Sequence, residues 1–82
     1  MVVVHRSRGF RLVIYTLDHE PAHVHVTGPG QAKINLRGEG GVPELIYNVG
    51  IGRADLRRLM LEVAEHQVRL LQEWERIHGR VD

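Results

Sequence analysis

The sequence HVHVTGPGQAKINLR, residues 23–37, specifies the architecture of this chain. Apolar and polar residues alternate on both sides of a Gly28-Pro29-Gly30 turn, and this alternation is typical of two antiparallel strands that each bury one face. Glycine reaches turn conformations that other residues avoid, and proline cannot pair within a central strand. The segment therefore predicts a β-hairpin that turns at the Gly-Pro-Gly tripeptide.

Short apolar runs on both sides of this hairpin have the spacing of further strands. The candidate strands are Val2 to Val4, Phe10 to Leu17, His23 to Thr27, Ala32 to Arg37 and Leu45 to Val49. Their short connections favour antiparallel pairing in sequence order, which is a meander.

A helical period replaces the strand period in the last third of the chain. Apolar residues recur at three- and four-residue steps from Arg53 to His78, and Gly79 stands where a helix commonly ends. We therefore expect an α+β fold. In it, an antiparallel meander sheet of about four to five short strands, within residues 1–50, packs on one long C-terminal helix, residues 53–78.

Length and composition indicate one soluble domain. The 82 residues are 43% hydrophobic and 26% charged with a formal net charge of +1, so we expect residues 1–82 to form a single domain. The chain has no cysteine, which excludes disulfides and thiolate zinc sites. No apolar run approaches the roughly 18 residues of a membrane span, and the N-terminus lacks a signal-peptide pattern. We expect a cytoplasmic protein with no membrane partner.

The polar half of the strand pattern is rich in groups that bind RNA. If the apolar residues face the helix, the opposite face carries Arg11, Tyr15, His23, His25, Lys33, Asn35 and Arg37. Arginine and lysine bind phosphates, tyrosine stacks on bases, and histidine exchanges protons near neutral pH. We therefore predict that Arg11, Lys33 and Arg37 bind RNA. His23, His25 and Tyr15 are the catalytic candidates for a metal-independent endoribonuclease, and an ordinary solvated sheet face is the open alternative.

Three of the six histidines fall within seven residues of the segment DHEPAHVHV, residues 18–26. His23 and His25 project side by side from a strand, and His19 lies in the turn before them. Three interpretations stay open. The histidines would bind zinc or another divalent transition metal, with Asp18 or Glu20 adding an oxygen ligand or orienting an imidazole. Alternatively one histidine would act as general base, with a neighbouring arginine stabilising the developing charge and no metal cofactor, or the histidines would only bond the backbone of the turn.

The helical segment contains residues that do not fit a simple apolar stripe. His66 lies at the edge of the stripe, so we expect it half-buried at the margin of the sheet. Gln67 lies nearer the centre, and a buried amide there needs hydrogen-bond partners at a strand end. Trp74 is expected in the core. Leu61 and Val68 lie off the stripe and widen the apolar surface, which would suit a second contact.

Two groups of residues follow the motifs of a known family. The first group is Asp18, His19, Pro21, His23, His25 and Val26, and the second, in the helix, is Glu65, His66, Leu70, Leu71, Trp74 and Glu75. On these residues the chain resembles a family of small bacterial proteins catalogued as domain of unknown function four-one-six-zero. The order of elements also agrees, so the resemblance covers most of the chain. Ala22, Val24 and Glu73 depart from the family pattern without changing the histidines.

The resemblance implies a role beside a partner. Members of the family look like components of bacterial toxin–antitoxin pairs, which implies a small cognate antitoxin-like protein as partner and RNA as a target. Our leading hypothesis is therefore a toxin-like component that binds or cleaves RNA with its basic, histidine-containing sheet face. Two alternatives stay open. One is a non-catalytic protein-interaction module, for which a second copy of the chain is a possible partner, and the other is a small metal-binding protein with His19, His23 and His25 as ligands.

Overall fold

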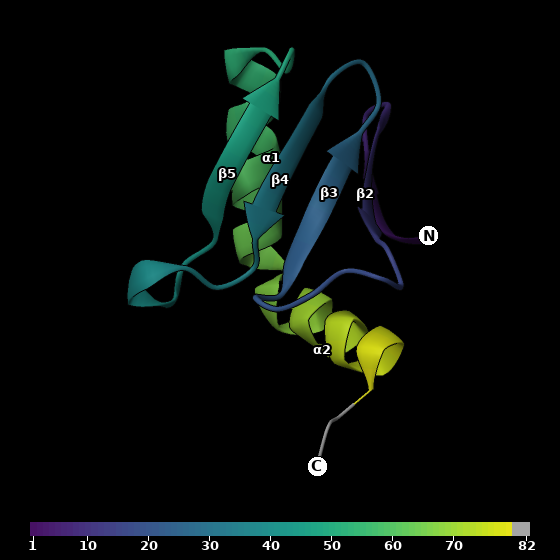
Figure 1. Cartoon of the computed structure of the whole chain (residues 1–82). Helices are drawn as coiled ribbons and strands as arrows, with labels where there is room; N and C mark the ends of the chain where they lie inside the picture. The colour runs from purple at the N-terminus through teal and green to yellow at the C-terminus, as the bar shows by residue number, and fades with distance from the viewer. Residues whose placement is uncertain (80–82) are drawn as a thin grey trace.

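The computed structural model describes residues 1–79, which form one antiparallel sheet and two helices (Figure 1). The strands are β1 (Val2–Ser7), β2 (Phe10–Ile14), β3 (His23–Thr27), β4 (Gln31–Asn35) and β5 (Glu44–Val49), with a short 3-10 helix η1 (Glu39–Gly41) before β5. They pair in the order β1-β2-β3-β4-β5, and the helices α1 (Arg53–Glu65) and α2 (Gln67–His78) follow. The expected α+β meander is confirmed. In the described part of the chain, no helix has the length and apolarity that a membrane span requires.

The hairpin predicted at Gly28-Pro29-Gly30 joins β3 to β4, and its register places His25 opposite Lys33. Only glycine fits at position 30, because a Cβ there would lie 2.7 Å from the backbone carbonyl carbon of Gly50. The chain leaves β5 at Gly50 and passes directly against the hairpin turn. This close approach ties the middle hairpin to the connection that leads into α1.

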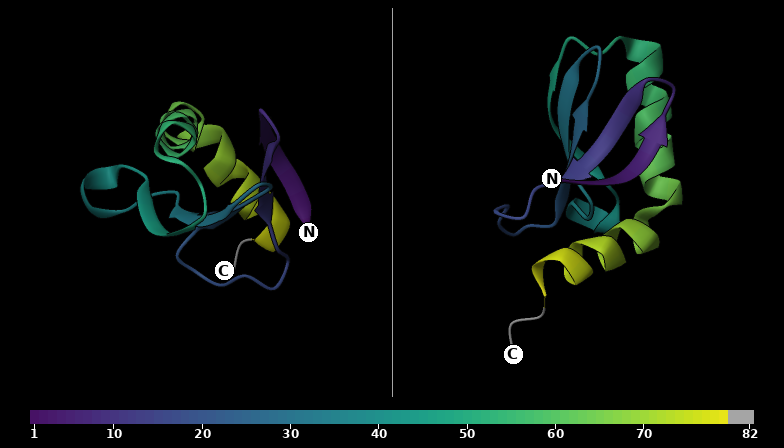
Figure 2. Two further views of the ribbon diagram at one scale, coloured as in Figure 1. Left: turned by 90° about the horizontal axis from the view of Figure 1, so that it is seen from above. Right: turned by 90° about the vertical axis from the view of Figure 1, so that its right-hand side faces the viewer.

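The two helices cover one face of the sheet (Figure 2). The strands contribute alternate residues to this interface, among them Leu12, Ile14, Val24, Val26 and Ile34, and the helices contribute Leu59, Val63, Leu70 and Trp74. Each such aliphatic side chain contributes roughly 1.5–3 kcal/mol when it is fully buried. Because Val24 and Val26 point toward the helices, His23 and His25 lie on the opposite face, which we call the open face.

The prediction of a single long helix over residues 53–78 is wrong, because the helix breaks at His66. This residue has φ −102° and ψ 17°, and α2 leaves at an angle to α1 (Figure 2, right). A straight helix over the whole segment would extend about 39 Å, whereas strands of this length span about 17–20 Å. The bend keeps Leu70 in the core. Gln67 anchors the start of α2, since its Nε2 donates to the carbonyl of Leu36 at 2.7 Å.

The two edges of the sheet differ in character. Arg6 stands on the β1 edge strand, and Arg69 of α2 donates to the carbonyl of Val4 at 2.8 Å. By contrast, β5 carries exposed apolar side chains along its length: Leu45, Ile46, Tyr47 and Val49. An apolar edge strand is open to pairing with another chain.

Glu62 of α1 links the helix to β1. Its carboxylate lies 2.7 Å from His5 Nε2, accepts a hydrogen bond from Ser7 Oγ at 2.8 Å, and lies 3.4 Å from Arg58 Nε. Burial alone would raise the pKa of Glu62, but the hydrogen bonds from His5 and Ser7, with the nearby positive charges, hold that pKa below its usual value. The ionised carboxylate is therefore the form that the folded state prefers.

We expect Glu62→Gln to lower the free energy of unfolding by about 1–3 kcal/mol at pH 7, because it removes a charge that accepts two hydrogen bonds. A depressed folded-state pKa stabilises the fold above the unfolded-state pKa and loses this effect as the pH falls through the folded-state pKa. The difference between variant and wild type should therefore shrink in acid. Urea unfolding at neutral and acidic pH measures it, with the exposed Glu65→Gln as control. An equal loss at both pH values would contradict the prediction.

Candidate functional site

Asp18, His23 and His25 form a compact cluster on the open face, which we call the Asp-His-His cluster. The Nε2 atoms of His23 and His25 lie 3.2 Å apart. The two oxygens of Asp18 face them, with Oδ2 at 3.3 Å from His23 Nε2 and Oδ1 at 3.5 Å from His25 Nε2. One potential metal-ligand atom from each residue therefore lies within 4.8 Å of the other two.

Local backbone structure explains why these three residues meet. His23 and His25 are two residues apart on β3, so both rings project from the same face of the sheet. After β2, the Asp18 amide donates to the carbonyl of Tyr15 at 3.1 Å, and the Tyr15 amide donates to Asp18 Oδ2 at 3.0 Å. This reciprocal turn brings the connection between β2 and β3 over the open face (Figure 2, left). The same carboxylate thus closes the turn and faces both rings.

The ring of His23 has a defined orientation. Its Nδ1 lies 2.9 Å from the carbonyl of Pro21, which can only accept, so Nδ1 carries a proton and donates. In the neutral ring, Nε2 then presents a lone pair to His25 and Asp18. The His23 side chain is 5% exposed and its ring centroid lies 5.1 Å from that of Trp74. His23 is therefore a buried residue as well as a member of the cluster.

His25 lies closer to solvent, with its side chain 21% exposed. Burial lowers the pKa of His25, electrostatic repulsion by His23 and Lys33 lowers it further, and the Asp18 carboxylate only partly offsets these effects. The pKa of His25 therefore lies below its usual value, and the ring is neutral at pH 7. Tyr15 contacts it edge-on, with ring centroids 5.0 Å apart.

The structure places the other predicted site residues on more than one surface. Arg11 and Lys33 lie on the open face, opposite Thr27 and His25 respectively. His19 is exposed and outside the Asp-His-His cluster.

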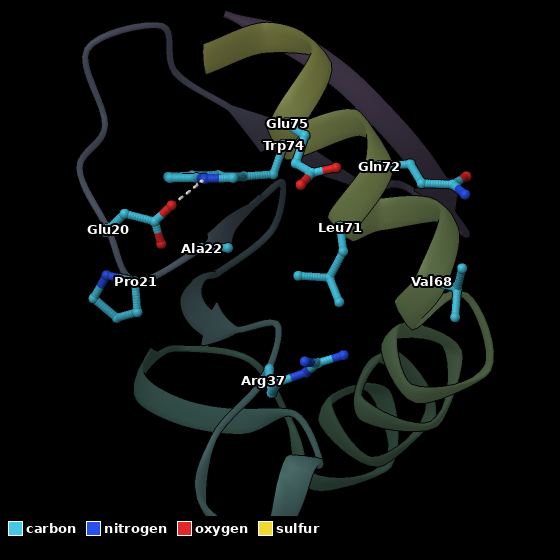
Figure 3. A pocket seen from close by; sticks show the side chains of 9 residues that line it. All are labelled: Glu20, Pro21, Ala22, Arg37, Val68, Leu71, Gln72, Trp74 and Glu75. Carbon is cyan, nitrogen blue, oxygen red and sulfur yellow. Dashed lines mark hydrogen bonds between the residues drawn. The ribbon is translucent and has the colours of Figure 1, made fainter. Parts of the chain in front are cut away.

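Arg37 and His66 lie away from the Asp-His-His cluster, whereas Trp74 packs on its His23. Arg37 lines a different surface, the groove beside α2 (Figure 3). His66 is half-buried as expected, and its ring centroid lies 4.9 Å from that of His5. Trp74 is buried in the core as expected.

The groove beside α2 has a volume of about 500 Å³ and an apolar floor. Figure 3 shows Leu71, Val68 and Trp74 of α2 on one side, with Ala22 and Arg37 facing them. The Trp74 indole donates to the Glu20 carboxylate at 3.1 Å. This bond links α2 to the segment that precedes β3.

Sequence reasoning did not assign Arg6 to the open face, although it lies directly opposite Arg11. The predicted first strand ended at Val4, so its alternation did not reach Arg6. The strand continues to Ser7, whose hydroxyl bonds Glu62. The bulge between Val3 and His5 shifts the alternation by one residue, so the period of two continued from Val2 and Val4 would have placed Arg6 on the helix-facing side.

Comparison with known proteins agrees with the motif in the histidine segment. The family model described as "Domain of unknown function (DUF4160)" matches residues 9–75. These residues include the whole Asp-His-His cluster, β2 to β5 and most of both helices. No match was found among curated proteins or among solved structures.

The different burial of the two histidines predicts different costs of removing them. His23→Ala should lower the free energy of unfolding by about 2–3 kcal/mol, because it leaves a cavity beside Trp74 and an unpaired Pro21 carbonyl. His25→Ala should cost about 1 kcal/mol or less, since its ring is partly in water. Urea unfolding followed by Trp74 fluorescence compares the two variants. Equal losses would show that His23 does not have the structural role assigned to it.

Proposed function

The chain belongs to this family of unknown function, and we propose that it binds a divalent transition-metal ion, zinc before others, through Asp18, His23 and His25. Two imidazole nitrogens and a carboxylate are donors that suit zinc, and a site without cysteine can still hold it. The observation that carries the proposal is the spacing of the donor atoms in the Asp-His-His cluster.

The separation of the two ring nitrogens is close to the edge of a tetrahedral site. Two donors that each lie about 2.0–2.2 Å from a tetrahedral zinc ion are about 3.3–3.6 Å apart. The two ring nitrogens are 3.2 Å apart, and they lie 3.3 and 3.5 Å from different oxygens of Asp18, so that one ligand atom per residue lies within 4.8 Å of the others. The cluster would therefore accept an ion with little rearrangement of its side chains.

The surroundings of the cluster support the same proposal. Histidine ligands commonly donate their second ring nitrogen to a backbone carbonyl, and His23 does so to Pro21. Asn35 lies directly opposite His23 on β4, and its buried Oδ1 has no hydrogen-bond partner among residues 1–79. A polar ligand beside the cluster would satisfy this atom.

Three protein ligands leave one tetrahedral position for water or a substrate. A zinc ion in such a site polarises bound oxygen atoms and lowers the pKa of a bound water to about 7. Asp18 and His25 are partly exposed, so this position is reachable from solvent. In this proposal the histidines are neutral ligands, whereas a metal-free acid and base would each need to face the substrate and not each other.

Zinc added to metal-free protein should bind as one ion per chain. Asp18→Asn keeps the acceptor that closes the turn but removes the charge. The Asp18→Asn, His25→Ala double variant should weaken zinc binding by at least about 100-fold. His19→Ala is the matched control, because this histidine is exposed and lies outside the Asp-His-His cluster. A competing chromophoric chelator measures affinity, and the visible spectrum of the cobalt(II) form reports tetrahedral coordination. Binding that His19→Ala abolishes and His25→Ala preserves would overturn the ligand assignment.

The exposed β5 edge favours a second candidate function, docking of a protein. We propose that a second copy of this chain pairs with β5, antiparallel and about a two-fold axis. The edge is apolar on both faces, and antiparallel pairing of two copies would place Glu44 of one strand near the Val49 end of the other. The toxin-like role beside an antitoxin-like protein rests on the family resemblance and stays a prediction.

Light scattering of the purified chain tests this pairing. The wild type should be a dimer at micromolar concentration, and Ile46→Lys should be a monomer, because a charge on an edge strand opposes pairing. Leu61→Lys, on the exposed face of α1, is the control and should remain dimeric. A wild type that is monomeric at all concentrations would exclude the homodimer.

A further inference from the structure

Among residues 1–79, the open face carries positive charges that form no ion pair. Arg6 of β1 lies directly opposite Arg11 of β2, and both side chains are exposed. Within the described part of the chain, neither forms an ion pair. Like charges that face each other across two strands destabilise a sheet. This pair therefore costs stability unless an anion lies on it.

A second row on the same face adds a third cation and an aromatic ring. His25, Lys33 and Tyr47 are paired in sequence across β3, β4 and β5. Lys33 also has no ion pair among residues 1–79, and the Tyr47 side chain is exposed. Tyr15, against His25, supplies a second exposed ring. Cations beside exposed aromatic rings are the groups that bind single-stranded nucleic acid.

Two unpartnered oxygens on this face point to a polar ligand. Thr27 Oγ1 and Asn35 Oδ1 are buried side-chain atoms with no hydrogen-bond partner in the described residues. Thr27 lies opposite Arg11, and Asn35 lies opposite His23. Buried polar atoms are nearly always bonded, so each of these oxygens is available to accept a hydrogen bond from water or from a ligand. Both residues lie on the open face among the cations and the Asp-His-His cluster.

We propose that a single-stranded nucleic acid lies across the open face, with its phosphates on Arg6, Arg11 and Lys33. Its bases stack on the exposed tyrosines, and hydroxyl or base-edge groups bond the unpartnered oxygens. The phosphodiester backbone passes beside the Asp-His-His cluster, and this part rests on the proposed function. Arg37 is not included, because it lines the groove beside α2.

Fluorescence anisotropy with labelled RNA of about twelve nucleotides tests the proposal, with DNA of the same sequence to separate the two sugars. The Arg6→Ala, Arg11→Ala double variant should bind at least about tenfold more weakly. It should also reduce the slope of log affinity against log salt by about 1.4, or about 0.7 per lost phosphate contact. Arg57→Ala, an exposed arginine on α1, is the control and should bind as the wild type does.

Tyrosine variants report the stacking contact separately. Tyr47→Ala should weaken binding by about tenfold, whereas Tyr47→Phe should retain it, because phenylalanine keeps the stacking surface. Binding that is unchanged in both the double arginine variant and Tyr47→Ala would overturn the assignment of this face. Equal affinity for heparin would show that the face selects charge and not nucleic acid, and would also overturn it.

Measurements on metal-free and zinc-loaded protein distinguish this proposal from the metal site. If RNA binding persists without metal and is lost in the double arginine variant, the result supports nucleic-acid binding on the open face. The zinc titration then decides the metal site independently. If the protein binds zinc but neither RNA nor DNA, only the proposal of nucleic-acid binding on the open face is overturned. Far-UV circular dichroism of each variant shows that a loss of binding is not a loss of fold.

Discussion

The burial of Val24 and Val26 beneath the helices is the constraint on which the site depends. Both side chains are essentially inaccessible to water, and a strand that buries them cannot shift by one residue without exposing both. His23 and His25 are therefore held on the opposite face with their rings side by side. The register of β3 is thus specified by apolar packing and not by the histidines themselves.

A second constraint completes the cluster from the chain that leads into β3. The turn closed by the Asp18 carboxylate and the Tyr15 amide brings an acidic group over two imidazole rings. His23 is then tied to Pro21 and packed on Trp74, so helix, connection and strand all contribute to its position. Side chains held from several directions make a preorganised site, which lowers the cost of binding an ion.

Much of the fold follows from local patterns. The turn glycines, the alternation of the strands and the short connections predicted the meander, and all of these are effects between near neighbours in sequence. The break at His66 was not predicted, because the apolar period continues through it and the bend serves the end of a distant sheet. Likewise Arg37 lines the groove beside α2 and not the open face where it was predicted, since β4 ends at Asn35 and strand alternation no longer holds beyond it.

The amino-acid sequence was sufficient to predict the fold class, the pairing of β3 with β4 and the position of His23 and His25 side by side on one face, because each depends on the two-residue period of a strand. It was not sufficient to select Asp18 over His19 as their companion, or to place Arg6 opposite Arg11. Those juxtapositions depend on where a turn folds back and where a strand ends. Such features are settled by packing between segments that are far apart along the chain, which no local pattern records.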